Sequence, residues 1–203
     1  MKKRSYWWLT AGLLTLLLLH SGQQTRLPRT EAWTPPQSDL LDSLRWSEAA
    51  PLSPYDSLLH ACADSIGWDW RMLASVVYHE SRFLNHARSY RGALGLMQIH
   101  SKRYTDMELL DPATNLQIGS LYLKKLQGMF DAANPTESIN FALAAFNLGE
   151  GKVRQLCAAT ADVGLDPAYW ENVSTQLPQG HHTVRYVNDV LNTYAFYSQI
   201  YPR

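Results

Sequence analysis

The sequence has little of what several common classes of protein require. Its 203 residues include only two cysteines, too few for a disulfide-rich scaffold or a four-thiolate zinc site. It has no basic excess, with 18 Lys and Arg against 18 Asp and Glu, which argues against binding of nucleic acid, a partner that needs positive charge on the protein. No stretch alternates apolar and polar residues over the length of a strand. What is present is 46% hydrophobic and 11% aromatic residues, enough to build a core and exclude a disordered chain.

The first 22 residues predict a segment that directs export. Basic residues Lys2 to Arg4 precede an uncharged, leucine-rich run from Ser5 to Leu19. This order is typical of a secretory signal, and the run is short for a membrane span, which needs roughly 20 apolar residues. Because His20 to Gly22 does not form a clean cleavage site, a retained N-terminal anchor in the inner membrane is the alternative, and a buried N-terminal helix is less favoured. We therefore expect a protein of the periplasm or cell envelope, either free or membrane-anchored.

The remainder divides into a linker and one folded domain. Residues 23–52 contain four prolines and no sustained apolar period, which indicates a linker. The folded unit is expected to span residues 53–203. A domain of about 150 residues buries roughly 70% of the surface that its unfolded chain exposes, enough for an independent core.

Helix signals dominate this domain, so its predicted fold class is mainly α. Helices are expected to begin at Ser53-Pro54, Asp111-Pro112 and Asn134-Pro135, where a capping side chain precedes proline, and at Asp69, which is a capping residue alone. The second of them is expected to end near Ser81. A last long helix is expected around Val184 to Tyr194. The glycine-containing segment 88–104 leaves room for one short β-hairpin.

The cysteines and histidines do not form a recognisable metal site. Cys62 and Cys157 each lie in a helical pattern without a His or Cys partner at ligand spacing. Export would allow a disulfide between them, but two separate buried thiols are equally compatible with the sequence. His181 and His182 are adjacent and lack a third ligand at helical spacing. We expect neither a metal nor a cofactor.

One carboxyl group occupies a position where an apolar residue is expected. Leu73, Val76 and Val77 define a core-facing stripe, and the next position of that stripe is Glu80. Burial raises the pKa of a carboxyl group, and a carboxylic acid that stays protonated near neutral pH can act as a general acid. Taken alone, a solvated or Arg82-paired glutamate at the helix end is the more ordinary interpretation. The adjacent His79 is expected to face another side of the helix.

Two further segments could present side-chain amides to a ligand. In the first, Gly92 and Gly95 permit tight backbone geometry just before Gln98. In the second, Asn147 follows an apolar helix and precedes Gly149. Each segment could equally be a turn or a helix end without a binding role.

Taken together and in order, these blocks resemble a known family. The order is Glu80-Ser81-x-Phe83, Gly92-Ala93-x-Gly95-Leu96-Met97-Gln98, Asp111-Pro112-x-x-Asn115, Ala144-Ala145-Phe146-Asn147-x-Gly149-x-Gly151 and Tyr186-Val187. This closely resembles the catalytic domain of the soluble-type lytic transglycosylases (SLT domain), which are related to goose-type lysozyme. The resemblance spans roughly residues 70–195.

The resemblance implies a lysozyme-like helical domain with a substrate cleft. It implies cleavage of the β-1,4 bond between N-acetylmuramic acid and N-acetylglucosamine in peptidoglycan glycan strands, with a 1,6-anhydromuramoyl product. Glu80 matches the family's single catalytic acid. Matches to positions that contact sugar or orient the acid are Ser81, Met97, Gln98, Asn147 and Tyr186.

The sequence departs from the family pattern in two places. Phe146 stands where the family often has Tyr, which removes one hydroxyl from the expected cleft wall. The usual Glu-Thr-Arg-x-Tyr-Val segment has become His182-Thr183-Val184-Arg185-Tyr186-Val187. These changes bear on substrate affinity or site rigidity more than on the chemistry, because Glu80 and Tyr186 are retained.

Two other functions compete with this interpretation. A hydrolytic muramidase of the same fold would need a second carboxylate to activate water, and Asp106, Glu108 and Asp111 are candidates by position. A non-catalytic peptidoglycan-binding or assembly module is the other alternative. It is favoured by the altered segment 182–185 and disfavoured by retention of Glu80 beside Ser81.

Overall fold

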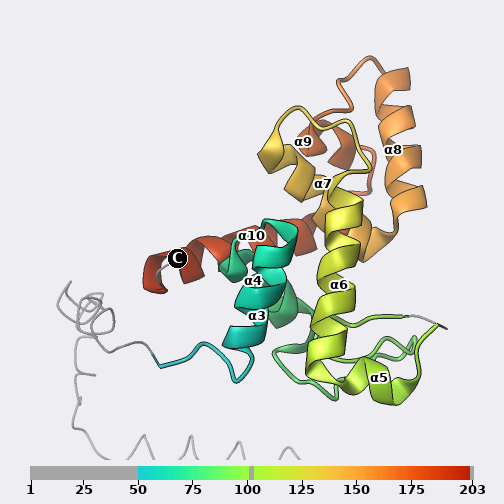
Figure 1. The fold of residues 1–203 in the computed structure, drawn as a ribbon. Helices are drawn as coiled ribbons and strands as arrows, with labels where there is room; N and C mark the ends of the chain where they lie inside the picture. Colours follow the sequence, from blue (N-terminus) through green and yellow to red (C-terminus); the bar gives the residue numbers. More distant parts are fainter. Residues whose placement is uncertain (1–49, 101–102, 202–203) are drawn as a thin grey trace, which may run out of the picture. The chain divides into compact units, whose positions relative to one another are not determined.

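The computed structural model describes residues 50–100 and 103–201, and this part of the chain is helical (Figure 1). Its helices are α3 (Asp56–Ile66), α4 (Trp70–Ser81), α5 (Asp106–Leu110), α6 (Pro112–Gln127), α7 (Pro135–Leu148), α8 (Glu150–Asp162), α9 (Trp170–Ser174) and α10 (His182–Ile200). The predicted mainly-α class is therefore confirmed. The predicted export segment and residues 23–49 of the predicted linker lie outside the described residues.

The described part of segment 88–104, for which a short hairpin was one option, forms only isolated bridges. Leu94 pairs in antiparallel fashion with Arg88 and with Ile99, and no strand is assigned between residues 88 and 100. The segment is a compact loop, which lies at the lower end of the domain in Figure 1, on a level with α5.

Most of the predicted helices begin where they were expected, each with a side chain that caps its first turn. Asp69 accepts a hydrogen bond from the backbone N–H of Arg71 at 3.0 Å, and Asp111 and Asn134 cap α6 and α7 in the same manner. The first helix was predicted two residues too early, because it begins at Asp56 rather than Ser53-Pro54. The Asp56 carboxylate instead accepts from the backbone N–H groups of Leu52 and Ser53, so it anchors the chain that precedes the helix.

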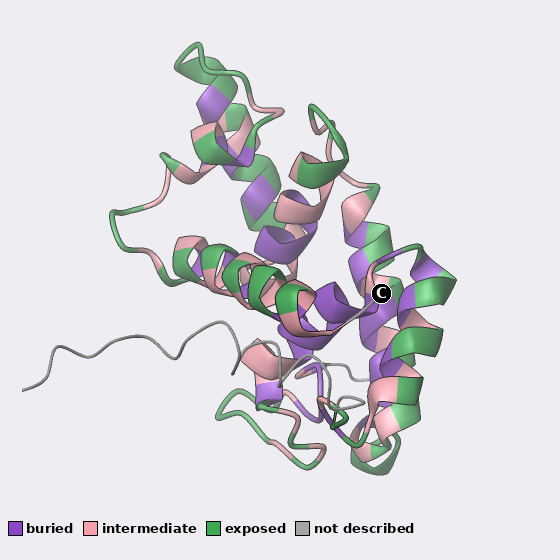
Figure 2. Cartoon of the chain, turned by 90° about the vertical axis from the view of Figure 1, so that its left-hand side faces the viewer, coloured by how far each residue is buried: buried purple, intermediate pink, exposed green. Residues whose placement is uncertain are grey.

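Helix α4 is the centre of the domain and carries the predicted acid. Every residue from Trp70 to Val77 is buried, and the central helices are purple in Figure 2. The helix packs against α3 and α10, while α7 packs against α6, α8, α9 and α10. A helix buried on all sides offers a rigid support for a side chain at its end, because its position is fixed by contacts from several directions.

The two cysteines lie in different helices and are not bonded. Cys62 is in α3 and Cys157 is in α8, and both are free thiols. Of the two alternatives left open by the sequence, the structure has separate, half-buried thiols, and burial raises the pKa of each.

Among the residues described, no helix is long and apolar enough to cross a membrane.

Candidate active site

Glu80 lies in the last turn of α4, where the apolar stripe meets α10. Leu73, Val76 and Val77 have no exposed surface, so the stripe that predicted partial burial of Glu80 is present. The hydroxyl of Tyr186, from α10, donates a hydrogen bond to Oε1 of Glu80 at 2.7 Å. The acid and the tyrosine are separated by 106 residues in the sequence, and the packing of α4 on α10 brings them together.

The surroundings of Glu80 favour its protonated form near neutral pH. Burial raises the pKa of this carboxyl group to about 7, and the hydrogen bond from Tyr186 opposes the shift. Burial and the neighbouring Glu80 carboxyl also raise the pKa of the Tyr186 hydroxyl well above its ordinary value. Tyr186 therefore keeps its proton and remains a donor. A carboxyl group that titrates near 7 can both give and take a proton at physiological pH.

Neighbours on α4 do not neutralise Glu80 by pairing with it. The ring nitrogen Nε2 of His79 lies 2.8 Å from the hydroxyl of Thr193 on α10, so His79 has a partner of its own and does not pair with Glu80. The guanidinium of Arg82 lies 3.9 Å from the centre of the Tyr78 ring and donates to the Tyr78 carbonyl oxygen. Within the described residues, no ion pair involves Glu80.

The loop before α5 is shaped by a glycine that has no room for a side chain. Gly95 has a φ of 77°, and a Cβ atom at this position would collide with the Asn115 amide and the Leu109 carbonyl oxygen. Gln98 also has a positive φ, 49°. Its Nε2 donates to the carbonyl oxygens of Gly95, at 3.0 Å, and Ala87, at 3.2 Å. Both N–H groups of this amide therefore hold the loop, and Oε1 is left as a hydrogen-bond acceptor.

Asn115 fastens this loop to α6. Its Oδ1 accepts from the backbone N–H of Met97 at 2.7 Å, and its Nδ2 donates to the carbonyl oxygens of Leu94 and Leu109 at 2.9 and 2.7 Å. The side chain has no exposed surface. The sequence showed Asn115 only as part of the Asp-Pro-x-x-Asn block, and this local spacing carries no signal of a contact with a loop 18 residues earlier in the chain.

Two of the predicted binding residues lie beneath the surface. Met97 is fully buried and packs so closely on Gly119 that a side chain there would collide with it. Ser81 is also buried, and its hydroxyl donates to the Val77 carbonyl oxygen at 3.3 Å. These positions support packing below the site more than direct contact with a sugar.

The start of α10 reaches Asn147, at the end of α7. The hydroxyl of Thr183 donates to Oδ1 of Asn147 at 2.8 Å. Thr183 is fully buried, and its backbone N–H is capped by Nδ1 of His181 at 3.2 Å. Thr183 and Tyr186 are three residues apart on the helix and so share a face. Sequence reasoning assigned no role to Thr183.

The altered segment leaves this shared face intact. His182 and Arg185 are exposed and Val184 is half-buried. Thr183 and Tyr186 keep their contacts to Asn147 and Glu80. The departures from the family pattern therefore fall beside the acid-holding contacts and do not replace them.

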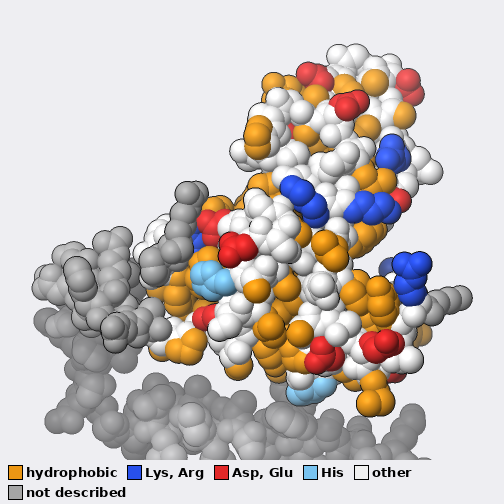
Figure 3. Space-filling view, viewed as in Figure 1, with side chains coloured by type: hydrophobic (Ala, Val, Ile, Leu, Met, Phe, Trp, Pro, Cys, Tyr) orange, Lys and Arg blue, Asp and Glu red, His pale blue; other side chains and the backbone are white. Residues whose placement is uncertain are grey.

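A pocket of about 480 Å³ lies between the loop of Gln98, α6 and the end of α7. Its lining is Gln98, Ile99, His100, Arg103, Tyr104, Ile118, Tyr122 and Phe146. In Figure 3 the surface is hollowed between the end of the domain that holds α5 and the end that holds α7 and α8, with Lys and Arg side chains on both sides. Of the predicted site residues, Gln98 lines the pocket, and Phe146 in its wall directly precedes Asn147. Glu80 and Tyr186 are not among the lining residues.

A tyrosine from another helix faces the same pocket as Phe146. The rings of Tyr122 and Phe146 are 5.9 Å apart, and the Tyr122 hydroxyl lies 3.4 Å from Oε2 of Glu150. Tyr122, on α6, thus adds a tyrosine to the lining of the pocket beside Phe146. Glu150, which also lies 3.7 Å from the Lys125 ammonium, is an acid that the sequence reasoning did not consider.

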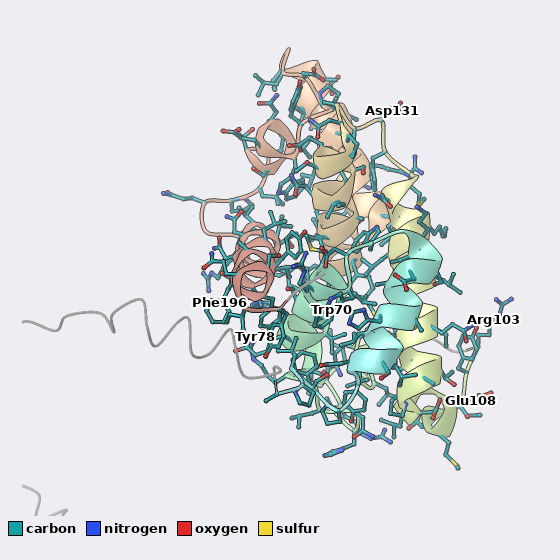
Figure 4. The ribbon with its side chains drawn as sticks, turned by 60° about the vertical axis from the view of Figure 1, so that its left-hand side comes forward. Trp70, Tyr78, Arg103, Glu108, Asp131 and Phe196 are labelled. Atoms are coloured by element: carbon teal, nitrogen blue, oxygen red, sulfur yellow. The ribbon has the colours of Figure 1, made fainter. Side chains whose placement is uncertain are left out.

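The three carboxylates considered as partners of Glu80 serve the local structure around α5. Glu108 forms a capping box with Thr105, and Asp111 caps α6. Hydrogen bonds to these caps lower the pKa of Glu108 and of Asp111. Asp106 pairs with Arg88 at 2.7 Å. All three are exposed, and Figure 4 shows Glu108 at the outer edge of the domain.

In the part of the chain that the structure describes, no three His, Cys, Asp or Glu side chains form a cluster that could hold a metal ion.

Comparison with known proteins supplies relatives for this arrangement. Residues 58–164 match the family model described as Transglycosylase SLT domain. The chain is 32% identical over 168 residues to a membrane-bound lytic murein transglycosylase F from Desulfosudis oleivorans, an alignment that covers 73% of this chain and 37% of the relative. The chain thus spans little more than a third of that relative's length.

Solved structures show the same fold. The crystal structure of the 70 kDa soluble lytic transglycosylase from Escherichia coli matches with a TM-score of 0.58 and 28% identity, covering 78% of this chain and 26% of that one. An inactive Glu-to-Gln mutant of the lytic transglycosylase Slt from Pseudomonas aeruginosa matches with a TM-score of 0.55 and 26% identity, covering 72% and 24%. The lysozyme-like helical fold expected from the sequence is therefore confirmed.

Proposed function

From the fact that the chain belongs to the transglycosylase SLT domain family, we propose that it is a lytic transglycosylase of peptidoglycan. Its substrate would be the glycan strand, and its reaction would cleave the β-1,4 bond between N-acetylmuramic acid and N-acetylglucosamine. The observation that carries this proposal is the half-buried Glu80 carboxyl group, with a pKa of about 7 and a tyrosine hydroxyl on its Oε1.

Glu80 would act first as an acid. Its proton passes to the glycosidic oxygen while the bond from that oxygen to C1 of the muramic acid breaks. The positive charge that develops at C1 is stabilised by the acetamido oxygen of the same sugar. General acid help of this kind contributes roughly 10²–10⁴-fold to a rate.

Glu80 would then act as a base. As a carboxylate it takes the proton of the C6 hydroxyl of the muramic acid, and the C6 oxygen bonds to C1 to close a 1,6-anhydro ring. This step returns the proton to Glu80 and consumes no water. A hydroxyl on the same molecule has an effective concentration of up to about 10⁵ M or more when well oriented, so a second carboxylate that activates water is not needed.

Tyr186 would assist the basic stage of this cycle. Its hydroxyl donates to Glu80 Oε1, and donation to a carboxylate stabilises the ionised form more than the neutral one. The same contact opposes the rise in the pKa of Glu80 that burial causes. Tyr186 therefore keeps the acid close to the pH at which it can exchange its proton in both directions.

Replacing Tyr186 with Phe is expected to shift the pH dependence of the reaction. Activity requires protonated Glu80, so it falls as the pH rises through the pKa of that group. Without the hydroxyl the pKa rises, and the falling limb of the pH–rate profile should move to higher pH while kcat decreases about 10-fold, because the carboxylate intermediate loses one charge-assisted hydrogen bond. Initial rates of anhydro-product release between pH 5 and pH 9 measure both effects. An unchanged or downward-shifted limb would contradict this role.

The mass of the released products tests the proposed reaction. Purified peptidoglycan is digested with the full chain, and the muropeptides are analysed by mass spectrometry. We expect products one water lighter than hydrolysed muropeptides. Products of ordinary mass would instead indicate a hydrolytic muramidase, and Glu150→Gln would then test the carboxylate in contact with Tyr122 of the pocket lining as the second carboxylate. The absence of both products would favour a non-catalytic wall-binding module.

The place of action follows from the substrate. Peptidoglycan lies outside the inner membrane, and the basic-then-apolar start of the chain supports export to the periplasm or cell envelope. A relative bears a name that describes it as membrane-bound, which supports retention of the N-terminal segment as an anchor.

A further inference from the structure

Two side-chain amides, those of Gln98 and Asn147, have opposite hydrogen-bonding groups left unbonded by the described part of the protein. Gln98 donates both of its N–H groups to backbone carbonyl oxygens, so it can offer a ligand only its oxygen. Asn147 has its oxygen occupied by the Thr183 hydroxyl. Among residues 50–100 and 103–201, no hydrogen-bond acceptor is found for Nδ2 of Asn147. Asn147 therefore has two N–H donors left for a ligand.

The orientation of the Asn147 amide, oxygen or NH2 toward the ligand, depends on one hydroxyl group. The two ends of an amide have nearly the same shape, so packing alone does not decide which end faces a ligand. Thr183 is fully buried, its backbone is capped by His181, and its β-branched side chain is restricted in χ1. A hydroxyl can also accept, but Asn147 Oδ1 is the acceptor for this O–H among the described residues. If the hydroxyl accepted from Nδ2 instead, its own buried proton would lose that partner, so the orientation with Oδ1 toward Thr183 is the more favourable one.

We propose that Thr183 is a positioning residue whose hydroxyl fixes the amide of Asn147 so that this side chain offers the glycan only hydrogen-bond donors. The cleft would then present one acceptor, at Gln98, and one donor pair, at Asn147, to the substrate. Such a pair suits a sugar whose acetamido and hydroxyl groups both donate and accept. The inference deepens the proposed function and rests on it for the identity of the ligand.

The first test needs no catalysis. The side-chain amide signals of Asn147 in a ¹H–¹⁵N NMR spectrum are identified as the pair that disappears in Asn147→Ala. We expect Thr183→Val, which keeps the shape and removes the hydroxyl, to shift these signals, and Thr183→Ser to leave them near their original positions. Signals that do not move in Thr183→Val would overturn the proposal, whether or not the chain has the proposed activity.

The second test is a double-mutant cycle on the release of anhydro products. Thr183→Val should lower kcat/KM about 3- to 10-fold, the worth of one ordinary hydrogen bond, and Thr183→Ser should restore most of it. In the Asn147→Ala background, Thr183→Val should have no further effect. The falling limb of the pH profile should stay in place, because Thr183 does not contact Glu80.

A merely structural role of Thr183 predicts different results. The losses caused by Thr183→Val and Asn147→Ala would then multiply, and serine would restore activity only in proportion to thermal stability. That outcome, or wild-type kcat/KM in Thr183→Val, would overturn the proposal. A wild-type chain that releases no anhydro product would instead refute the proposed function, and the NMR comparison would still decide the role of Thr183.

Discussion

Glu80→Gln is expected to abolish the release of anhydro products from peptidoglycan. Glutamine has nearly the same shape as the acid and can still accept the hydrogen bond from Tyr186, but it can neither give nor take a proton. Because one carboxyl group serves both steps of the proposed reaction, its loss removes at least the roughly 10²–10⁴-fold contribution of general acid catalysis and the base as well. Binding of the glycan should survive. An inactive Glu-to-Gln mutant is known for the Pseudomonas aeruginosa relative.

Glu108→Gln is the matched control for this change. Glu108 is an exposed acid in the capping box of α5, and glutamine is accepted at that position of a capping box. We expect this variant to release product at the wild-type rate, so a loss in Glu80→Gln alone would be specific to the half-buried acid. Product release by Glu80→Gln within a few-fold of wild type would contradict the assignment.

Glu80→Gln should not destabilise the fold at alkaline pH. Because burial raises the pKa of Glu80 from 4.5 to about 7, the folded chain binds its proton more tightly than the unfolded chain. The acid therefore becomes unfavourable to folding as the pH rises from about 4.5 to about 7, and the penalty is constant above that range, at most roughly 3 kcal/mol. Glutamine carries no such penalty. Urea unfolding at pH 8 should find Glu80→Gln at least as stable as wild type, which separates loss of chemistry from loss of structure.

Asn115→Ala is expected to lower the free energy of unfolding by about 3–5 kcal/mol. The side chain makes three buried hydrogen bonds, and alanine would remove these partners of the Met97 N–H and the Leu109 carbonyl oxygen, while the Leu94 carbonyl oxygen would keep its bond from the Ile99 N–H. Each buried polar group left unsatisfied costs about 1–3 kcal/mol. Because these hydrogen bonds hold the loop that carries Gln98 in position, activity should fall together with stability. Urea unfolding at neutral pH measures the stability effect.

Two further variants accompany this test: Asn115→Asp changes the chemistry at the same position, and Asn188→Ala is an exposed control. Aspartate keeps the acceptor for the Met97 N–H but directs a negative charge at two carbonyl oxygens, so it should be as destabilising as alanine or more. Asn188 is an exposed residue of α10, and its replacement by alanine should change stability by less than about 0.5 kcal/mol. An Asn115→Ala variant within about 1 kcal/mol of wild type would show that the loop does not depend on this side chain.

The parts of the structure that the sequence predicted are governed by local interactions. The caps at Asp69, Asp111 and Asn134 bind N–H groups two or three residues away, so their residue types identify the helix starts directly. The partial burial of Glu80 followed from the period of a single helix. The first helix was predicted two residues too early because Asp56, three residues after Ser53, is itself the first residue of the helix, and its carboxylate accepts a hydrogen bond from the Ser53 N–H in the chain before it.

The parts that the sequence did not predict depend on contacts between distant segments. Nothing near Thr183 in the chain shows that its hydroxyl meets Asn147, which lies 36 residues away. The contact of Asn115 with the loop of Met97 and the contact of Tyr122 with Glu150 are equally nonlocal. The sequence could name the amides of the site, but only packing decides which of their atoms remain available.

A direct titration of the Glu80 carboxyl group tests the central claim that one sheltered acid holds its proton at neutral pH. The side-chain carboxyl carbon is followed by ¹³C NMR in the full chain, and its signal is assigned by its absence from Glu80→Gln. The account predicts a midpoint near pH 7, with a higher midpoint in Tyr186→Phe. A midpoint near 4.5, the ordinary value for glutamate, would contradict it, since the acid would then be ionised before it could donate its proton.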